Sequence, residues 1–222
     1  MREEPVIILN YKTYVESTGR KGRVLTRTAH EVARERNVRI IVCPQTPDLY
    51  LHKDSEIEVF AQHVDPIEPG SHTGHVLPLA LVEAGASGSL INHSEDRMPA
   101  DRIKKCVDIC RQHKLTSVVC AESIDKVKEV AAFKPDYIAI EPPELIGSGI
   151  PVSKADPGIV SKSVEAVRAI DPSIVVLCGA GISKGEDVKA ALELGTRGVL
   201  LASGVVKAKD PRKALLDLVS LI

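Results

Sequence analysis

Residues 138–149, IAIEPPELIGSG, place a carboxylate where an apolar segment meets a loop that has two prolines at one end and Gly-Ser-Gly at the other. A carboxylate in a shielded pocket loses hydration, and it becomes a stronger base once water is excluded. Residues 91–96, INHSED, place a histidine at a similar junction. A histidine opposite a base can move a proton between two oxygens or polarise a carbonyl group. Glu141 and His93 are therefore candidate acid–base residues, although singly each could be structural.

A repeated alternation of apolar segments and amphipathic helices must position these residues. Eight units in 222 residues favour a closed (β/α)8 barrel over a doubly wound sheet. A dinucleotide-binding sheet should also lead from its first strand into a glycine-rich turn, whereas this chain continues with Asn-Tyr-Lys-Thr. The segments are continuously apolar, as in strands buried on both faces, and lie at Val6–Leu9, Arg39–Val42, Val59–Ala61, Ser89–Ile91, Ser117–Val119, Tyr137–Ile140, Ile174–Leu177 and Gly198–Leu201.

Helix-end signals support the same organisation. An amphipathic helix is predicted over 24–36, with Asn37 as a left-handed stop. Ser183 and Glu186 form a predicted capping box, and Asp210-Pro211 opens the last helix. No linker or charge block divides the chain, so the sequence predicts one compact α/β domain over residues 1–222.

In such a barrel the residues that follow the strands gather at one end. CGAGIS and LASG, after the last two strands, offer mainly backbone, and amide groups in this position commonly bind phosphate. A tight turn is the alternative for Gly-x-Gly alone. Lys12 would be the fixed positive charge near a phosphate or a developing negative oxygen. The polar residues that follow the earlier strands are Asn10, Lys12, Gln62, His63, Asn92, His93 and Glu141.

Composition excludes several other classes of protein. With 29 basic and 30 acidic residues the chain has no global field for nucleic acid or an anionic membrane. It has no membrane-length apolar run and no signal peptide, and its five cysteines fit reduced thiols in a cytoplasmic protein. The spacing of Cys106, Cys110 and His113 fits a metal site or, as we expect, a helix face packed on the core.

These motifs, in this order along essentially the whole chain, closely resemble triosephosphate isomerases, and the short chain with its EPPELIG segment is similar to the archaeal branch. The resemblance implies a TIM barrel that interconverts dihydroxyacetone phosphate and D-glyceraldehyde 3-phosphate through an enediolate, without cofactor or metal, in glycolysis and gluconeogenesis. It makes Glu141 the base and His93 a neutral electrophile. Asn10 and Lys12 become substrate contacts, with Glu95 as support for Lys12. The family is a well-known example of this acid–base pairing and of loop closure.

The resemblance also implies further binding residues. Tyr11, which stands where many members have tryptophan, is counted with the substrate-binding residues. The double proline after Glu141 and the glycines at 147 and 149 would make the intervening loop a hinged lid. Amide groups that bind or line the phosphate site are expected at Ile146, Gly147, Gly181, Ala202 and Ser203.

The segment HTGHV at 72–76 resembles the loop that reaches a neighbouring subunit in this family. Thr73 is therefore expected at an interface of a homo-oligomer, and the archaeal branch implies a tetramer. His63, His72 and His75 could suggest a metal site, but polar interface loops often contain histidines.

Two other classes stay open. An aldolase would need a Schiff-base lysine on an inner strand position, and an epimerase would need metal ligands; neither is evident. A non-catalytic binder of a phosphate ligand would keep the glycine loops and could discard Glu141 or His93.

Overall fold

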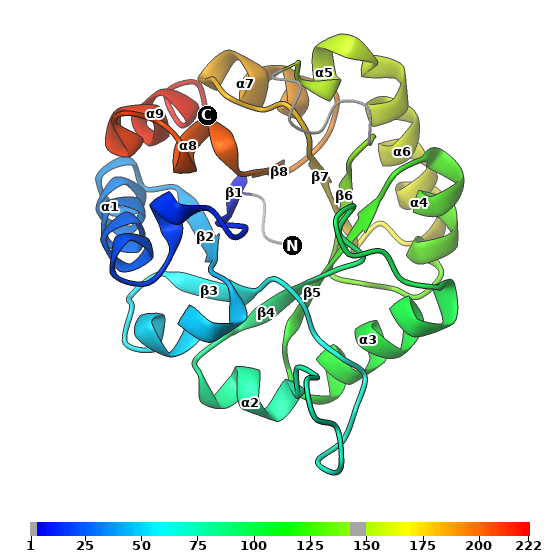
Figure 1. The fold of residues 1–222 in the computed structure, drawn as a ribbon. Coiled ribbons are helices and arrows are strands. Elements are labelled where there is room, and N and C mark those ends of the chain that lie inside the picture. The colour runs from blue at the N-terminus through cyan, green and yellow to red at the C-terminus, as the bar shows by residue number, and fades with distance from the viewer. Residues whose placement is uncertain (1–3, 143–149) are drawn as a thin grey trace.

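The computed structural model describes residues 4–142 and 150–222. Its parallel strands form a closed barrel in sequence order, and β1 completes the ring by pairing with β8 (Figure 1). The predicted α/β TIM barrel is therefore confirmed, and every predicted strand overlaps an observed one. The strands are β1 Val6–Asn10, β2 Arg39–Cys43, β3 Glu58–Ala61, β4 Gly88–Ile91, β5 Thr116–Ala121, β6 Tyr137–Ile140, β7 Val175–Cys178 and β8 Gly198–Leu201.

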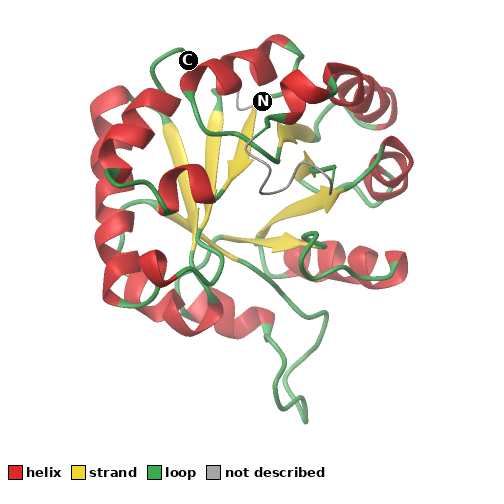
Figure 2. Cartoon of the chain, turned by 45° about the horizontal axis from the view of Figure 1, so that its top comes forward, coloured by secondary structure: helices red, strands yellow, loops and turns green. Residues whose placement is uncertain are grey.

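Helices surround the barrel on the outside (Figure 2). The connection between β2 and β3 contains the 3-10 helix η2, Thr46–His52, where the other crossovers have α-helices. No helix within the described ranges combines the length and apolar character needed to cross a membrane. The remaining helices are η1 Val15–Ser17, α1 Arg20–Arg36, α2 Pro78–Glu83, α3 Ala100–Gln112, α4 Ile124–Ala131, α5 Val152–Ala155, α6 Pro157–Ile170, α7 Gly185–Glu193, α8 Ser203–Val206 and α9 Pro211–Leu218.

Two of the predicted helix ends are confirmed. Asn37 ends α1 in the left-handed conformation, with φ 51°, and its amide donates to carbonyl groups of the last turn. Asp210 caps α9, because its carboxylate accepts a hydrogen bond of 3.0 Å from the amide of Lys213. Both residues satisfy backbone groups that a helix leaves without partners at its ends.

The predicted capping box of α7 is wrong by one residue. The helix begins at Gly185, so its third residue is Asp187 and not Glu186. The Asp187 carboxylate accepts hydrogen bonds of 3.1 Å from the amides of both Ser183 and Lys184. A carboxylate in the third helical position can reach back to these amides, whereas a residue one position earlier points elsewhere.

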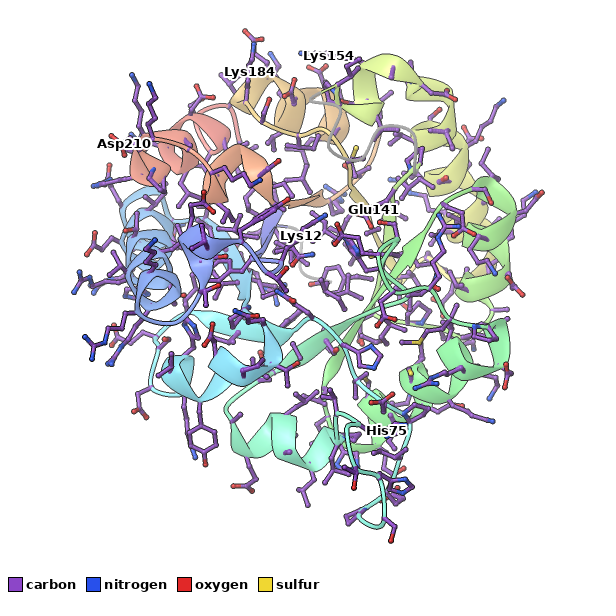
Figure 3. The ribbon with its side chains drawn as sticks, viewed as in Figure 1. Lys12, His75, Glu141, Lys154, Lys184 and Asp210 are labelled. Carbon is purple, nitrogen blue, oxygen red and sulfur yellow. The ribbon has the colours of Figure 1, made fainter. Side chains whose placement is uncertain are left out.

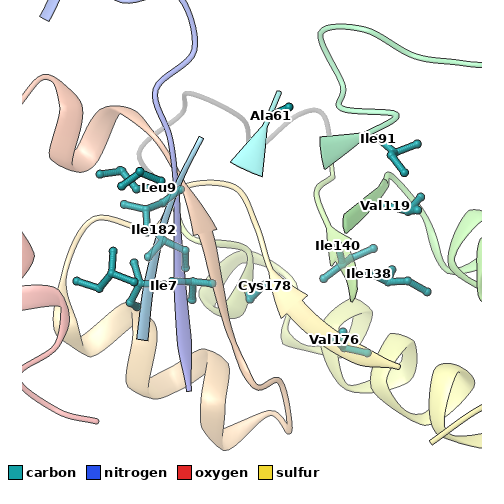
Figure 4. Packing of buried hydrophobic residues seen from close by; sticks show 14 of the residues in the cluster. Ile7, Leu9, Ala61, Ile91, Val119, Ile138, Ile140, Val176, Cys178 and Ile182 are labelled. Atoms are coloured by element: carbon teal, nitrogen blue, oxygen red, sulfur yellow. The ribbon is translucent and has the colours of Figure 1, made fainter. Parts of the chain in front are cut away.

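Side chains alternate along each strand between two packed layers. Ile7 and Leu9 point outward to the helices, among the apolar residues that Figure 4 shows. Val6 and Ile8 point into the barrel, where they pack with residues such as Phe60. This alternation fills the barrel with side chains, so that a ligand can enter only at an end.

Arg39 crosses the barrel at the end where the strands begin. Its guanidinium donates two hydrogen bonds to the carboxylate of Glu58, at 2.6 and 2.7 Å, and a third of 2.6 Å to the hydroxyl of Tyr137. These residues open β2, β3 and β6. The network therefore ties together three strands at the end opposite the predicted site.

The cysteines that were expected in the core lie there. Cys106 and Cys110 on α3 are fully buried, and burial raises the pKa of both thiols to about 12. They are therefore uncharged thiols that pack as small apolar residues.

A buried polar chain supports the loop after β1. The hydroxyl of Tyr11 lies 2.7 Å from Oγ1 of Thr26, which in turn lies 3.0 Å from Nδ1 of His52. Tyr11 and His52 are almost completely buried. Burial is the largest effect on the pKa of His52 and lowers it. The nearby Asp48 carboxylate raises this pKa by a smaller amount, and the charge of Arg23 lowers it by less still. The folded protein therefore favours the neutral imidazole.

This burial predicts a pH-dependent loss of stability. The unfolded chain binds a proton at His52 more readily than the folded protein, so the free energy of unfolding should fall as the pH decreases below about 6.5. His52→Asn should show a smaller fall between pH 7.5 and pH 5.5, measured by urea unfolding. His72→Asn, which changes an exposed histidine, is the control. An equal fall in wild type and His52→Asn would contradict this account.

Candidate active site

One cavity of about 100 Å³ opens at the carboxyl ends of the strands. It contains side chains or backbone from the ends of β1, β4, β6, β7 and β8, which the barrel brings together from across the sequence. Figure 3 shows Lys12 and Glu141 near the barrel axis. The predicted site residues that line this cavity are Asn10, Lys12, His93, Glu141, Gly181, Ala202 and Ser203.

Lys12 is held in a backbone conformation that is uncommon for a residue with a side chain, with φ 48°. Its amide donates to Oδ1 of Asn10 at 2.9 Å, and its carbonyl accepts from Nε2 of Gln62 at 3.0 Å. The ammonium group donates to the carboxylate of Glu95 at 2.7 Å. Both ends of the residue are therefore fixed, and its charge is kept beside the cavity.

The hydrogen bonding of His93 indicates its tautomer. Nδ1 accepts a hydrogen bond of 3.2 Å from the amide of Glu95, so that nitrogen cannot carry a proton. The proton of the neutral ring is then on Nε2, which lies 3.8 Å from Oε2 of Glu141. His93 is buried. The ring therefore presents an N–H donor to the cavity.

Glu141 is a buried carboxylate that is only partly satisfied. Its amide donates to the carbonyl of Ala121 at 2.8 Å, which fixes the start of the loop against β5. Within the part of the chain that the structure describes, Oε2 has no hydrogen-bond partner. A buried carboxylate oxygen in this state costs free energy, and such atoms are concentrated where a ligand or a proton is to be bound.

The space around Glu141 depends on a glycine and a thiol. A Cβ on Gly179 would lie 2.3 Å from Cγ of Glu141, so any side chain at that position would displace the carboxylate. Cys120 lies on β5 inside the barrel, and burial, reinforced by the nearby Glu141 carboxylate, raises its pKa well above the usual range. The neighbouring thiol therefore stays uncharged and does not compete with Glu141 for a positive partner.

The loops after β7 and β8 present backbone to the cavity. Ala180 and Gly181 are both in the left-handed region, with φ 62° and 72°, which turns the chain sharply after β7. A Cβ on Gly181 would lie 2.0 Å from the carbonyl oxygen of Ile150. Ser203 begins α8, where the first amide groups of a helix have no carbonyl partner within it. These loops can therefore donate hydrogen bonds to an anion.

Two predicted site residues, Tyr11 and Glu95, do not line the cavity. The Tyr11 side chain points into the core toward Thr26 and is fully buried, so the structure places it away from the cavity lining. Glu95 lies outside the lining and reaches the site through Lys12 and His93. Ile146 and Gly147, with the proposed hinge glycines and Pro143, lie outside the described residues.

Other residues at the site had no assigned role from sequence. Gln62 was recognised as polar and at a strand end, but its bonds to the carbonyls of Lys12 and Cys43 depend on the closed ring. Tyr14, Ser183 and Gly204 also line the cavity. Ser183 lies two positions after the GAG motif, at the end of the CGAGIS segment, which was a usable signal, whereas nothing in the local sequence distinguishes Tyr14.

The predicted interface segment extends away from the barrel. Thr73 and His75 are exposed, and Figure 3 shows His75 far from Lys12 and Glu141. His63, at the base of this segment, contacts carboxylates of Asp65 at 3.1 Å and Asp96 at 2.9 Å. Among residues 4–142 and 150–222, no cluster of three or more histidine, cysteine or acidic residues is arranged to hold a metal ion.

Comparison with known proteins gives a consistent result. A family model described as triosephosphate isomerase matches residues 5–222. A triosephosphate isomerase of Methanobrevibacter smithii is 52% identical over 97% of this chain and 98% of its own. That of Methanothermus fervidus is 53% identical, over 98% and 99% of the two chains. That of Methanocaldococcus jannaschii is 52% identical, over 98% and 100%.

Proposed function

The chain belongs to the triosephosphate isomerase family, whose members interconvert dihydroxyacetone phosphate and D-glyceraldehyde 3-phosphate in glycolysis and gluconeogenesis, and we propose how its residues divide this chemistry. The enzyme is an intramolecular aldose–ketose isomerase. The assignment of individual residues rests on the arrangement of Glu141, His93 and Lys12 around one cavity.

Glu141 is the base. Its Oε2, which has no hydrogen-bond partner in the described part of the chain, takes a proton from the substrate carbon next to the carbonyl group. The electron pair of the broken C–H bond forms the C=C bond of an enediolate, and the carbonyl oxygen takes the negative charge. Return of the proton from Glu141 to the neighbouring carbon, with transfer of a hydroxyl proton between the two oxygens, completes the isomerisation.

His93 and Lys12 stabilise the developing charge. The Nε2–H of His93, 3.8 Å from the base, can donate to the enediolate oxygens and move a proton between them. Lys12 supplies the positive charge, which Glu95 orients and partly balances. Asn10 fixes the Lys12 backbone and contacts the substrate from the same loop. This assignment rests on the Glu141 oxygen that faces a histidine N–H and has no hydrogen-bond partner among the described residues.

The substrate phosphate binds to the two backbone segments 179–183 and 202–204, which we call the phosphate loops. Amides of Gly181, Ala202 and Ser203 donate to its oxygens, and the first turn of α8 favours a negative charge. The predicted contributions of Ile146 and Gly147 stay predictions. No cofactor or metal is required by these steps.

We also propose a cytoplasmic homo-oligomer, a tetramer as in the archaeal branch, built from one barrel domain over residues 1–222. Large apolar side chains on η1 and η2 are exposed, including 67% of Val15 and 65% of Tyr50. Contact with a second subunit would bury such side chains. Thr73 lies on the extended segment and would contact the neighbouring subunit.

Sedimentation equilibrium should give the mass of four chains, and a monomer would contradict the proposal.

Glu141→Gln tests the base. The amide has nearly the same shape but cannot accept the proton, so kcat should fall by about 10²–10⁴-fold. Inhibition by inorganic phosphate should change little, because the phosphate loops are intact. Turnover is measured by a coupled assay in both directions. A kcat within about twofold of wild type would remove Glu141 from this role.

Ser203→Asp tests the phosphate loops. A carboxylate in the first turn of a helix is favourable, so thermal stability should be kept. The same charge should repel the substrate phosphate and raise KM by about tenfold or more. Ser203→Asn, which is similar in shape and uncharged, is the control. Equal KM values for the two variants would place the phosphate elsewhere.

A further inference from the structure

Asp187 is a buried carboxylate that joins two separate loops. Its side chain is 2% exposed, and one oxygen accepts a hydrogen bond of 2.7 Å from the ammonium group of Lys154. The other oxygen accepts from the amides of Ser183 and Lys184, at 3.1 Å each, and from the Ser183 hydroxyl at 3.3 Å. The capping box of α7 accounts for the hydrogen bonds from the Ser183 and Lys184 amides, but neither it nor a catalytic step accounts for the bond from Lys154, which needs another explanation.

The network holds one phosphate loop against the chain that precedes Lys154. Ser183 lines the cavity directly. Lys154 lies on α5, which follows Pro151, and the backbone of Ile150 and Pro151 packs against Gly181 so closely that a Cβ there would lie 2.0 Å from the Ile150 carbonyl oxygen. The loop after β7 is therefore fixed on one side by this close packing and on the other by Asp187.

The environment of Asp187 and Lys154 favours the charged form of both side chains. Burial opposes ionisation of Asp187, but the hydrogen bonds from Lys154 and from the Ser183 and Lys184 amides outweigh it and lower the pKa. The hydrogen bond with Asp187 raises the pKa of Lys154. The side chain of Lys154 is 49% exposed, so its replacement leaves no cavity in the core. In Figure 3, Lys12 and Glu141 lie near the barrel axis, whereas Lys154 and Lys184 lie at the periphery.

We propose that Lys154, acting through Asp187, is a positioning residue that sets the place of the phosphate loop 179–183. Without the ammonium group, Asp187 would keep, among the described residues, the hydrogen bonds from Ser183 and Lys184. The ion pair to α5 would then be lost, and Ser183 would be less firmly held relative to the cavity, although the packing of Ile150 on Gly181 would remain. Small displacements of binding groups weaken ligand binding disproportionately. This inference rests on the phosphate loops proposed above.

The test compares substitutions of two lysines. Lys154→Met keeps the aliphatic stem and removes the charge, whereas Lys154→Arg can still donate to Asp187. Lys189→Met is the matched control, because Lys189 lies on α7 and is exposed, and its contact with Glu193 is 3.9 Å long. For each variant we would measure kcat, KM, the inhibition constant of inorganic phosphate and the melting temperature.

Lys154→Met should raise KM and the inhibition constant of phosphate together by about three- to tenfold, with kcat within about twofold. Lys154→Arg should recover most of the loss, and Lys189→Met should resemble wild type. A lower melting temperature with unchanged KM and phosphate inhibition would overturn the proposal, because the pair would then be only structural. If Ser203→Asp also leaves KM unchanged, the phosphate loops themselves are misplaced. If only Lys154→Met has no effect, the failure concerns Lys154 alone.

Discussion

The carboxylate of Glu141 is kept buried beside a histidine N–H, with one oxygen that has no hydrogen-bond partner among the described residues. This arrangement is unfavourable for the protein alone, and much of the surrounding structure maintains it. Gly179 leaves the space that the side chain occupies, and the bond from the Glu141 amide to Ala121 fixes its backbone. If Glu141 is the base, as we propose, a substrate that supplies the missing interaction is bound where its proton can be taken.

The barrel supplies the rigidity that such a site requires. Strand pairing closes the ring between β1 and β8 and sets the order of the strand ends. Lys12 and Glu141, about 130 positions apart in the sequence, therefore meet at one cavity on a rigid frame. Uncommon backbone conformations occur at the site end, where Lys12 and Asn92 have positive φ values, as well as at helix ends such as Asn37. Asn92 is held by bonds to the Cys120 carbonyl at 2.8 Å and from the Met98 amide at 2.9 Å. Hydrogen bonds from neighbouring elements therefore stabilise backbone conformations that would otherwise be rare.

Much of this could be predicted from the sequence, because the strands are continuous apolar runs and the site residues follow them directly. Asn10, Lys12, His93 and Glu141 were found in this way, and so were the stops at Asn37 and Asp210. The predictions were wrong where the role of a residue depends on the direction of its side chain or on partners from distant segments. The helix start after Ser183 was misplaced by one residue, which exchanged Glu186 for Asp187.

Contacts between segments that lie far apart in the sequence could not be predicted from it, for the same reason. Tyr11 stands between two site residues, but its side chain turns to Thr26 in the core. The bond between Lys154 and Asp187 joins residues 33 positions apart on separate helices, and the capping-box motif that contains Asp187 gives no sign of Lys154. Spacing alone predicts which residues lie near a strand end, whereas the direction of each side chain depends on the closed ring.

In the proposed site Glu141 faces a neutral His93 whose proton is on Nε2. Nitrogen-15 NMR of the histidine rings, with His93 assigned through a His93→Gln variant, measures this directly at neutral pH. The account predicts a neutral ring with an unprotonated Nδ1 and a protonated Nε2 that shifts when a phosphate-bearing inhibitor is added. A charged imidazolium, or a proton on Nδ1, would contradict it.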